Sequence, residues 1–512
     1  MAQSTDRKDH LMTRFAFPRL LATLMLVLAA SAAVSDVGAN VTSYDRLPLG
    51  DWTYDAMIAL AADGVLTGTS ARLFQGGRLF TREEMAEVLS SAMRRPEILT
   101  DAQRALVKHV ALELGSELGR VCPDCPVGAQ DAPMDTDVLL LAYARERVLD
   151  DRGGAPGADS TALTYRATGF ANLTAETFAM LTFAEKEERF FHDLRTSTSL
   201  DKAFIAGNNR GTSWLVGRAY QNWGPSYSGS LILSDNAPAF WQARAARDID
   251  FGKAIGRVKV TQFASVFEDL DQKLYLIGRR YEKPLSDRWQ IGLSETAKLN
   301  KMPNPLVLAM PLYLYHYLFL HDEDEHMNNM VGADVLYRAS GGRRIYAELL
   351  IDDMTAPRLL SDDFSRPRKI GYTIGFSLPG PRGDHGSSFR VEYISVDRLT
   401  YSASRTDAPE LAYLHDTQYI GHAIGPNSEA LYLRGERVLS NRLSAVVEYL
   451  NQRQKDPGKP ERGSREYLSL TTSWDIAPDK SASVRVTPYE ITPPGGSSDH
   501  GVQYELRASF AL

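Results

Sequence analysis

The sequence predicts a mainly β protein, a large closed antiparallel transmembrane β-barrel of about 16–18 strands with an N-terminal α-helical domain. Three observations predict this fold. Helical periodicity mostly disappears after residue 163, strand-length segments separated by turn residues follow, and the last segment alternates apolar and polar residues to the chain end. The strand count follows from about 350 residues, at about 10 per strand and a similar allowance for each turn or loop.

The composition fits a folded protein and excludes several classes. Hydrophobic residues make up 44% of the 512 residues and charged residues 24%, which rules out a disordered or collagen-like chain. A net charge of −7 and the lack of a basic run argue against a nucleic-acid partner. A clean apolar stretch of about 18 residues is missing, so a helical membrane protein is excluded, whereas barrel strands average out to a polar composition.

Residues 1–39 have the layout of a secretory signal peptide. Arg14 and Arg19 precede the apolar run Leu20–Val34, and small residues follow that run. At about 1.5 Å per residue the run is about 22 Å long, which is shorter than the ~30 Å hydrocarbon core of a membrane. We therefore expect export of the chain and cleavage after Ala39.

Residues 40–148 are predicted to form a helical N-terminal domain. Asp51 is placed to cap a helix that runs to Asp63, and Thr81 with Glu84 forms the capping box of a second helix. Apolar residues at helical spacing predict a third helix and a fourth that starts near residue 135. These positions are Leu106, Val110, Leu114 and Leu118 in the third helix and Val138, Leu141, Ala142 and Val148 in the fourth.

Two cysteines, Cys122 and Cys125, lie in a single C-P-D-C sequence. A zinc ribbon needs a second cysteine pair, and a thioredoxin-like motif needs a βαβ context, whereas the flanking residues here look helical. In the oxidising compartment that export implies, we expect a local disulfide.

The first helix pair, residues 51–93, carries a recognisable set of short motifs. Trp52–Ala56 opens the first helix, Gly64–Gly68 follows it, and Phe74 precedes Thr81–Glu84. In these elements the pair resembles the S-layer homology repeat. Members of that family bind cell-wall polymers, usually through several copies of the repeat, and this chain has one copy. The resemblance implies a cell-wall contact, and the alternative is a small packing unit of the helical domain.

Residues 149–163 are rich in Gly, Ala and Asp and read as a linker, and residues 164–512 read as the barrel. Five pairs of strand-length segments, joined by turn sequences, predict antiparallel hairpins. The pairs are Lys273–Tyr281 with Trp289–Ala297, Val331–Ala339 with Arg344–Asp352, Lys369–Leu378 with Ser388–Ser395, Ala430–Val438 with Arg442–Asn451, and Glu466–Trp474 with Ser483–Ile491.

The last eleven residues alternate strictly between the two faces of a strand. Apolar residues occupy one face and mostly polar residues the other, as in the lipid-facing terminal strand of an outer-membrane barrel, although Leu512 stands where such strands usually end in Phe. The apolar face has Val502, Tyr504, Leu506, Ala508, Phe510 and Leu512, and the polar face has Gln503, Glu505, Arg507 and Ser509.

The stretch Gly217–Trp241 contains a specific motif. Trp223–Pro225, Gly229–Ser234 and Asn236–Ala237 occur in an order and spacing that resemble the central motif of the capsule assembly Wzi family. The resemblance implies an outer-membrane barrel of eighteen strands with an N-terminal helical bundle. It also implies a lectin that holds extracellular polysaccharide on the cell surface.

Binding of a sugar needs aromatic faces for its C–H surface and planar polar groups for its hydroxyls. The motif and its flanks, with Trp214 close by, supply both kinds of group. The alternative is that the Trp-Gly-Pro sequence makes a tight turn and the polar groups fix loops inside the barrel. The polysaccharide-binding candidates are Tyr220, Trp223, Tyr227, Asp235, Asn236 and Trp241.

Metal and catalytic motifs were sought elsewhere in the chain. Pro311–Leu320 reads as a strand, and Asp322–Glu325, flanked by His321 and His326, reads as a solvated loop rather than a calcium site because EF-hand spacing is missing. The sequence has no G-x-S-x-G, H-E-x-x-H or P-loop motif. We therefore predict a protein that is not an enzyme, with no catalytic residue, metal or cofactor.

The function predicted from these features is attachment or organisation of capsular or extracellular polysaccharide by an outer-membrane barrel. Its expected partners are that polysaccharide, outer-membrane lipid, and a cell-wall polymer through the helical domain. The alternative is a diffusion porin with a wall-contacting helical domain. The two differ in the lumen, since a porin is open and an attachment lectin should be plugged.

Overall fold

A computed structural model describes most of the chain after residue 50. The predicted signal peptide and the acidic stretch at residues 322–325 lie outside the described residues, as does most of the expected strand at 311–320 and its surroundings. The described ranges are 51–66, 80–125, 138–151, 160–174, 176–184, 199–209, 211–269, 272–302, 327–352, 369–379, 387–403, 408–440, 442–455, 463–477, 480–492 and 497–511.

The N-terminal region is helical, as predicted. Its helices are α2 (Trp52–Ala62), α4 (Arg82–Met93), the 3-10 turn η2 (Pro96–Ile98), α5 (Asp101–Glu113) and α6 (Gly115–Val121). The expected third helix is divided into α5 and α6 at Leu114, whose backbone leaves the helical conformation. Among the residues that the structure describes, no helix has the length and apolar character needed to cross a membrane.

Side chains fix the starts of the first two helices. The Thr53 N–H donates to the Asp51 carboxylate at 2.9 Å. Thr81 and Glu84 form the expected capping box, in which each side chain accepts a hydrogen bond from the backbone N–H of the other residue, at 3.1 and 2.8 Å. Such caps satisfy N–H groups that the first helical turn leaves without a partner.

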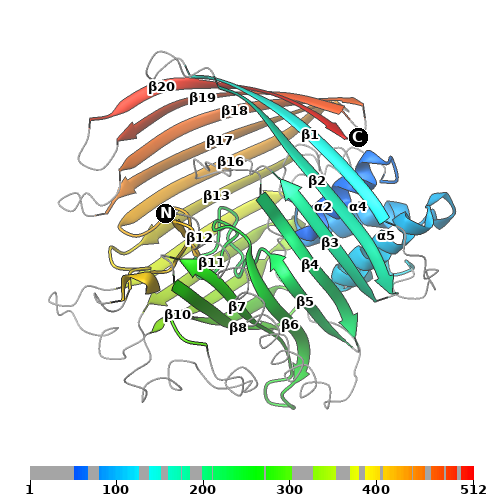
Figure 1. Cartoon of the computed structure of the whole chain (residues 1–512), viewed down its shortest axis with the longest axis horizontal. Coiled ribbons are helices and arrows are strands. Elements are labelled where there is room, and N and C mark those ends of the chain that lie inside the picture. The colour runs from blue at the N-terminus through cyan, green and yellow to red at the C-terminus, as the bar shows by residue number, and fades with distance from the viewer. Residues whose placement is uncertain are drawn as a thin grey trace, which may run out of the picture.

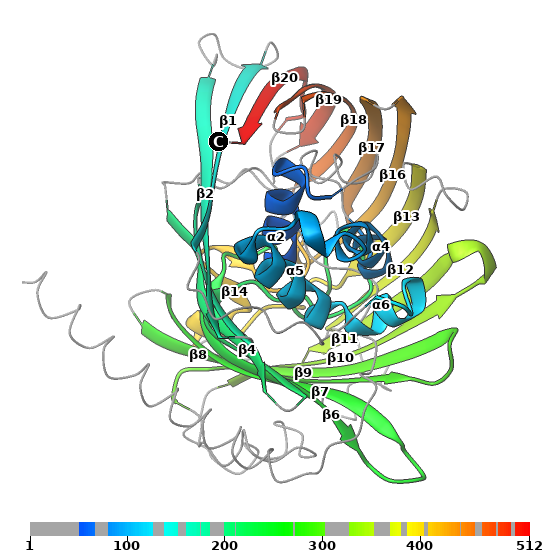
Figure 2. The ribbon, with the colours of Figure 1, turned by 90° about the vertical axis from the view of Figure 1, so that its right-hand side faces the viewer.

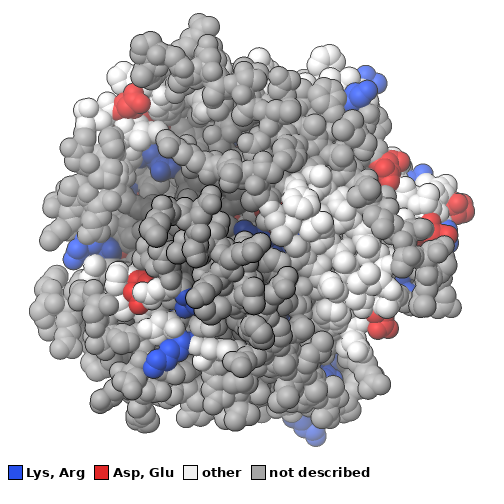
Figure 3. All heavy atoms as spheres, viewed as in Figure 1, with Lys and Arg blue, Asp and Glu red and all other residues white. Residues whose placement is uncertain are grey.

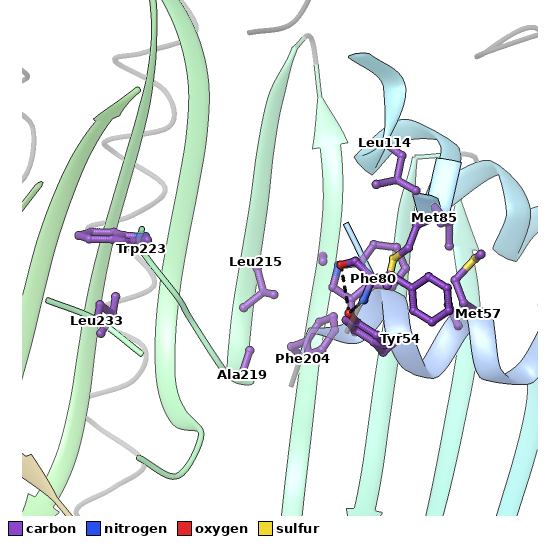
Figure 4. Close-up of a cluster of buried hydrophobic side chains, with 14 of the residues drawn as sticks. Tyr54, Met57, Phe80, Met85, Leu114, Phe204, Leu215, Ala219, Trp223 and Leu233 are labelled. Atoms are coloured by element: carbon purple, nitrogen blue, oxygen red, sulfur yellow. Dashed lines mark hydrogen bonds between the residues drawn. The ribbon is translucent and has the colours of Figure 1, made fainter. Parts of the chain in front are cut away.

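Helices α2, α4, α5 and α6, called the helical head below, pack on a core of buried side chains. Met57, Met85 and Leu114 meet there, and the Tyr54 hydroxyl accepts the Phe80 N–H at 2.7 Å (Figure 4). Cys122 and Cys125 form a disulfide, as expected. The head is therefore a packed unit with its own core.

In the described part of the chain, an eighteen-stranded antiparallel sheet follows the head (Figure 1). Each strand pairs with the next along the chain, β13 pairs with β16, and the first strand, β1, also pairs with the last, β20. The strands are β1 (Val138–Asp151), β2 (Ser160–Thr174), β3 (Thr177–Ala184), β4 (Ser199–Asn209), β5 (Thr212–Ala219), β6 (Phe240–Asp250), β7 (Arg257–Asp269), β8 (Gln272–Pro284), β9 (Trp289–Leu299), β10 (Met327–Arg338), β11 (Arg344–Asp352), β12 (Ile370–Pro379), β13 (Ser387–Val396), β16 (Ser428–Ser440), β17 (Leu443–Gln454), β18 (Ser464–Ala477), β19 (Lys480–Thr492) and β20 (Asp499–Ala511).

All five predicted hairpins are present. They are β8–β9, β10–β11, β12–β13, β16–β17 and β18–β19. The alternation of residues and the turn sequences were sufficient to find them, because a hairpin is specified within one short stretch of chain.

The predicted fourth helix is wrong, since residues 138–151 form strand β1. This strand pairs with β2 on one side and β20 on the other, so its backbone groups are satisfied on both edges. A short apolar run fits a helix or a strand equally well by periodicity, and pairing with distant strands decides between them. The described strands also extend over the ends of the expected linker, at residues 149–151 and 160–163.

The two ends of the sheet differ in their connections. At the end beside the helical head, successive strands are joined by short turns, such as residues 175–176 between β2 and β3 and 210–211 between β4 and β5. The opposite end has the longest connections, residues 220–239, 300–326 and 397–427. We call these the short-turn end and the long-loop end.

The two faces of the sheet are opposite in character to those of a soluble protein. On β12, Ile374 is 55% exposed while its neighbour Thr373 is buried, and on β20 Leu506 is 54% exposed. Charged side chains such as Glu348 and Glu392 are buried on the other face. In Figure 3 the broadest described area of the outer surface, right of centre, is uncharged, and charged side chains lie around it. Apolar residues outward and polar residues inward are the pattern of membrane barrels.

The helical head lies at the short-turn end, where the strands surround it in the view of Figure 2. It contacts the inner face of the sheet. The Trp52 ring lies 4.6 Å from the Phe178 ring on β3, measured between ring centroids, and His109 hydrogen-bonds Asn172 on β2 at 2.9 Å. One continuous apolar core joins the head to the inner wall.

Candidate functional site

The motif found in the sequence lies in the connection between β5 and β6, residues 220–239, called the inner segment below. Its backbone is hydrogen-bonded to inward-facing side chains of β11 and β13, and Trp223 and Leu233 lie beside the strands in Figure 4. The segment therefore lies against the inner face of the sheet and does not extend away from it.

The carboxylate of Glu348, on β11, holds one part of the inner segment. Its two oxygens accept the N–H groups of Ser226, at 2.9 Å, and Leu231, at 2.8 Å. Gly224 has a φ of 149°, and a Cβ there would overlap the same carboxylate, so only glycine fits. Hydrogen bonds to an ionised acceptor are among the stronger ones in proteins.

Glu392, on β13, holds the adjoining part. It accepts the N–H groups of Tyr227 and of Ser228, the latter at 2.7 Å. The Tyr346 hydroxyl donates to it as well, at 2.7 Å. Two buried carboxylates, on β11 and β13 with β12 between them, thus fix four backbone N–H groups of the inner segment.

The described residues of a second connection, 397–403 and 408–427, lie over the inner segment and are called the covering segment. The Tyr401 hydroxyl donates to the Leu231 carbonyl at 2.5 Å, and the Tyr413 hydroxyl donates to the Ile232 carbonyl at 2.9 Å. Burial raises the pKa of both tyrosines, so both remain protonated donors at neutral pH. The Ser234 N–H donates to the Ile420 carbonyl at 2.8 Å.

Tyr401 has an unusual backbone for a bulky residue, with a φ of 70°. Its N–H donates to the Asp352 carboxylate at 2.8 Å, and its hydroxyl also accepts the His422 N–H at 3.1 Å. A left-handed conformation at a non-glycine residue costs about 1–3 kcal/mol and persists where surrounding contacts determine it. The contacts of Tyr401 therefore hold the two segments together.

The two central candidates from the sequence are buried. Trp223 is 5% exposed, and its ring meets Phe263 edge-on at 5.2 Å between centroids. Tyr227 is 6% exposed, its ring is stacked near Tyr432, and the Arg390 guanidinium lies 4.0 Å from its centroid. In this arrangement both rings pack against the protein itself.

The other candidates are divided between the two faces of the sheet. Tyr220 is buried and donates to Asp201 at 2.5 Å, and the Asn236 amide donates to the Tyr419 carbonyl at 2.8 Å. Asp235 is half-buried in the inner segment. Trp241 lies on β6 and is 38% exposed on the outer face, away from the others. Five of the six candidates thus lie on the inner segment, but their side chains contact different parts of the inner wall: Tyr220 contacts β4, Trp223 contacts β7, and Tyr227 contacts β13 and β16.

One serine–histidine pair occurs in this region. The His422 Nε2 lies 3.1 Å from the Ser228 Oγ, and the His422 Nδ1 accepts the Ile424 N–H at 3.2 Å. Because Nδ1 accepts, the neutral ring carries its proton on Nε2 and donates it to the serine. This tautomer is the reverse of the one that activates a serine nucleophile, so the pair fixes the fold of the two segments.

Comparison with known proteins decides the family. Residues 151–492 match the family model described as capsule assembly protein Wzi, which is more than half of the chain. The chain belongs to the Wzi capsule assembly family. Residues 50–86 match the S-layer homology domain, where the sequence predicted that resemblance.

A solved structure shows the same fold. Wzi of Escherichia coli, whose structure is described as a carbohydrate-binding β-barrel, is 15% identical, with a TM-score of 0.55 over 91% of this chain and 99% of that one. OccD3 of Pseudomonas aeruginosa is 11% identical, with a TM-score of 0.41 over 73% of this chain and 91% of that one. No curated protein matches the sequence.

Proposed function

We propose that this protein is a plugged outer-membrane β-barrel that attaches or organises capsular or extracellular polysaccharide at the cell surface without being an enzyme. The observation that carries the proposal is the pair of inner and covering segments: Glu348 and Glu392 fasten the inner segment to the inner wall, and Tyr401 and Tyr413 bond the covering segment to it. Membership of the Wzi family supports the polysaccharide as ligand.

We infer that the sheet is a closed transmembrane barrel. The pairing of β1 with β20, from Tyr143 with Ala511 to Asp151 with Gln503, supports closure, because it leaves neither strand with an unpaired edge. Exposed apolar residues around the outer face support contact with lipid.

We also propose an orientation. Outer-membrane barrels have short periplasmic turns and longer extracellular loops. The short-turn end, with the helical head, would then face the periplasm, and the long-loop end would face outward. The single S-layer homology unit would lie on the side of the cell wall, which supports a wall polymer as a second partner.

The alternative of a diffusion porin requires an open lumen. Two segments hydrogen-bonded across the inside of the sheet oppose that role, since ions would have to pass between buried and mutually bonded groups. Among the predicted sugar contacts, Asp235 is the inner-segment candidate with a half-buried rather than buried side chain, and it is the first to test.

Two measurements test the proposal. The refolded full-length protein in planar bilayers should show little conductance, whereas steady porin-like conductance would contradict a plugged barrel. Cells that lack the protein should lose surface-bound polysaccharide into the medium, and the intact gene should restore it. Unchanged retention of polysaccharide in cells that lack the protein would refute the attachment role.

A further inference from the structure

A cavity of about 90 Å³ lies between the helical head and the sheet, at the short-turn end. Helices α2, α4 and α5 line one side and strands β3 to β7 the other. The turn residues Glu176 and Gly211 belong to its lining and are exposed, so it reaches the surface. A cavity needs about 10–15 Å³ for one water, so this one has room for a small chemical group.

The floor of the cavity is aromatic and fixed. Trp52 and Phe178 are in contact and both are buried. His109 beside them is hydrogen-bonded to Asn172, and burial lowers the pKa of its imidazole, against the opposing effect of that hydrogen bond. The ring is therefore neutral at pH 7 and contributes no positive charge to the cavity.

The charged groups of the lining leave one net positive charge. Four cationic residues and three acidic residues line the cavity. They are Arg82, Arg244, Arg247 and Lys259, with Glu113, Glu176 and Asp248. Glu117, which pairs with Arg82, and Asp51, on which Arg244 also acts, lie outside the lining, so the positive charge offered to a ligand is local to Arg244 and suits one negative charge rather than a doubly charged phosphate.

Arg82 forms ion pairs within the helical head. Its guanidinium lies 2.9 Å from the Glu113 carboxylate and 3.3 Å from that of Glu117, and its side chain is buried. It therefore supports the junction between α4, α5 and α6 and has little capacity left for a ligand.

Arg244, on β6, is placed differently. It is half-buried in the lining, and its side chain makes no ion pair or hydrogen bond within the described ranges. Burial raises the pKa of Glu113, but Arg82, Lys259 and Arg244 outweigh burial and hold that pKa below its usual value. The positive charge of Arg244 thus acts on a carboxylate that lines the cavity.

We propose that this cavity binds the carboxylate of an acidic sugar, with Arg244 as its anchor. A guanidinium offers paired N–H donors that match a carboxylate, and the aromatic floor accepts the C–H face of the sugar next to it. The site goes beyond the proposed surface attachment, because it lies at the opposite end of the sheet. Two sources have this chemistry: a uronic acid of the exported polysaccharide and the muramic acid peptide of the cell wall.

The test uses the purified full-length protein in detergent and isothermal titration calorimetry. The probes are an oligogalacturonate, the same oligosaccharide with its carboxyls reduced to alcohols, and muramyl dipeptide. The wild type should bind at least one carboxylate probe and not the reduced one. Arg244→Gln should weaken that binding by about tenfold or more. Arg442→Gln, an exposed arginine in the β16–β17 turn at the same end, should leave it unchanged.

The results identify which of the two sources supplies the carboxylate, and they show whether the proposed site exists. Binding of oligogalacturonate identifies the exported polysaccharide, and binding of muramyl dipeptide identifies the wall. If Arg244→Gln does not fold, Arg244→Lys keeps the charge and should bind with an intermediate affinity. No binding of either carboxylate probe by the wild type, equal binding of the reduced sugar, or unchanged binding by the folded Arg244 variants would overturn the proposal. Retention of surface polysaccharide, measured separately, reports on the proposed function alone.

Discussion

Asp55 of the helical head and Lys202 of strand β4 form an ion pair in which both side chains are almost fully buried. The pair joins α2 to the inner face of the sheet, and it connects residues 147 positions apart in the sequence. It lies in the same contact region as the Trp52–Phe178 and His109–Asn172 contacts, so head and sheet are docked through charge, aromatic packing and hydrogen bonding together.

Replacement of one partner of this pair should loosen the head. In Asp55→Asn, the buried Lys202 ammonium loses the charge of Asp55, and breaking a buried pair in this way typically costs about 3–5 kcal/mol. Limited proteolysis should cleave the head of the variant faster than that of the wild type. Asp63→Asn, at the exposed end of α2, is the control. Equal cleavage rates of Asp55→Asn and the wild type would contradict a docked head.

The carboxylate of Glu348 should keep the barrel non-conducting. Glu348→Gln replaces one of the two acceptor oxygens with an NH₂ group, which cannot accept the N–H of Ser226 or Leu231. We expect a measurable rise in single-channel conductance in planar bilayers. Glu429→Gln, on β16, removes a carboxylate that accepts a hydrogen bond from Tyr393 and makes no hydrogen bond to the inner segment in the described structure. If both variants conduct like the wild type, Glu348 does not hold the plug.

A charged side chain on the outer face of β20 should lower the stability of the folded protein in lipid. Leu506 is largely exposed, and arginine at a lipid-facing position near the bilayer midplane costs about 2–4 kcal/mol. Leu506→Arg should lower the urea concentration at the unfolding midpoint in lipid vesicles, whereas Leu506→Phe should change it little. A comparable midpoint for the two variants would place this residue outside the membrane or shift the strand register.

Loss of the buried Trp223 and Tyr227 rings should prevent folding rather than affect polysaccharide binding alone. Replacing Trp223 and Tyr227 together by Ala removes packing against Phe263 and Tyr432, and aromatic-to-alanine changes in a core cost about 3–5 kcal/mol each. The double variant should lose heat-modifiable migration on gels, and Trp223→Phe should keep it. A folded double variant that releases polysaccharide would instead restore the stacking-platform hypothesis.

Acid should weaken the docking of the head. Burial lowers the pKa of His109 in the folded protein below its ordinary value near 6.5, so the unfolded state binds more protons as the pH falls through that value. This contribution to stability is present above pH ~6.5 and is lost below it. The protection factors of the α5 amides, which correct for the base-catalysed intrinsic exchange rate, should therefore fall between pH 7.5 and pH 5, and less so in His109→Gln. Identical pH profiles of exchange would exclude His109 as the cause.

The sequence was most informative where the signal is local. Hairpins such as β10–β11 and the cap of Thr81 with Glu84 are specified within one short stretch, and both were predicted correctly. Strand β1 was predicted as a helix, because its partners β2 and β20 are not visible in its own residues. The local pattern of residues 138–151 fits either structure.

The inner wall of the site could not be found from the sequence. Glu348 and Glu392 are single carboxylates on strands, and their partners Leu231 and Tyr227 lie 117 and 165 residues away. No spacing in the chain marks such a contact. Arg244 is a similar case, because only the docking of the head turns that residue of β6 into the lining of a cavity.

The pairing of Tyr143 with Ala511 has a consequence for assembly. These residues lie on the first and the last strand of the sheet. The pairing of β1 with β20 can therefore form only after the whole chain has been exported. Contacts of such large sequence separation carry a high cost in chain entropy and form slowly. Until then β1 and β20 each present an open edge, which is prone to pair with other chains. A chain truncated before β20 should therefore remain in the periplasm as a substrate for chaperones and proteases, with its head folded and its sheet open.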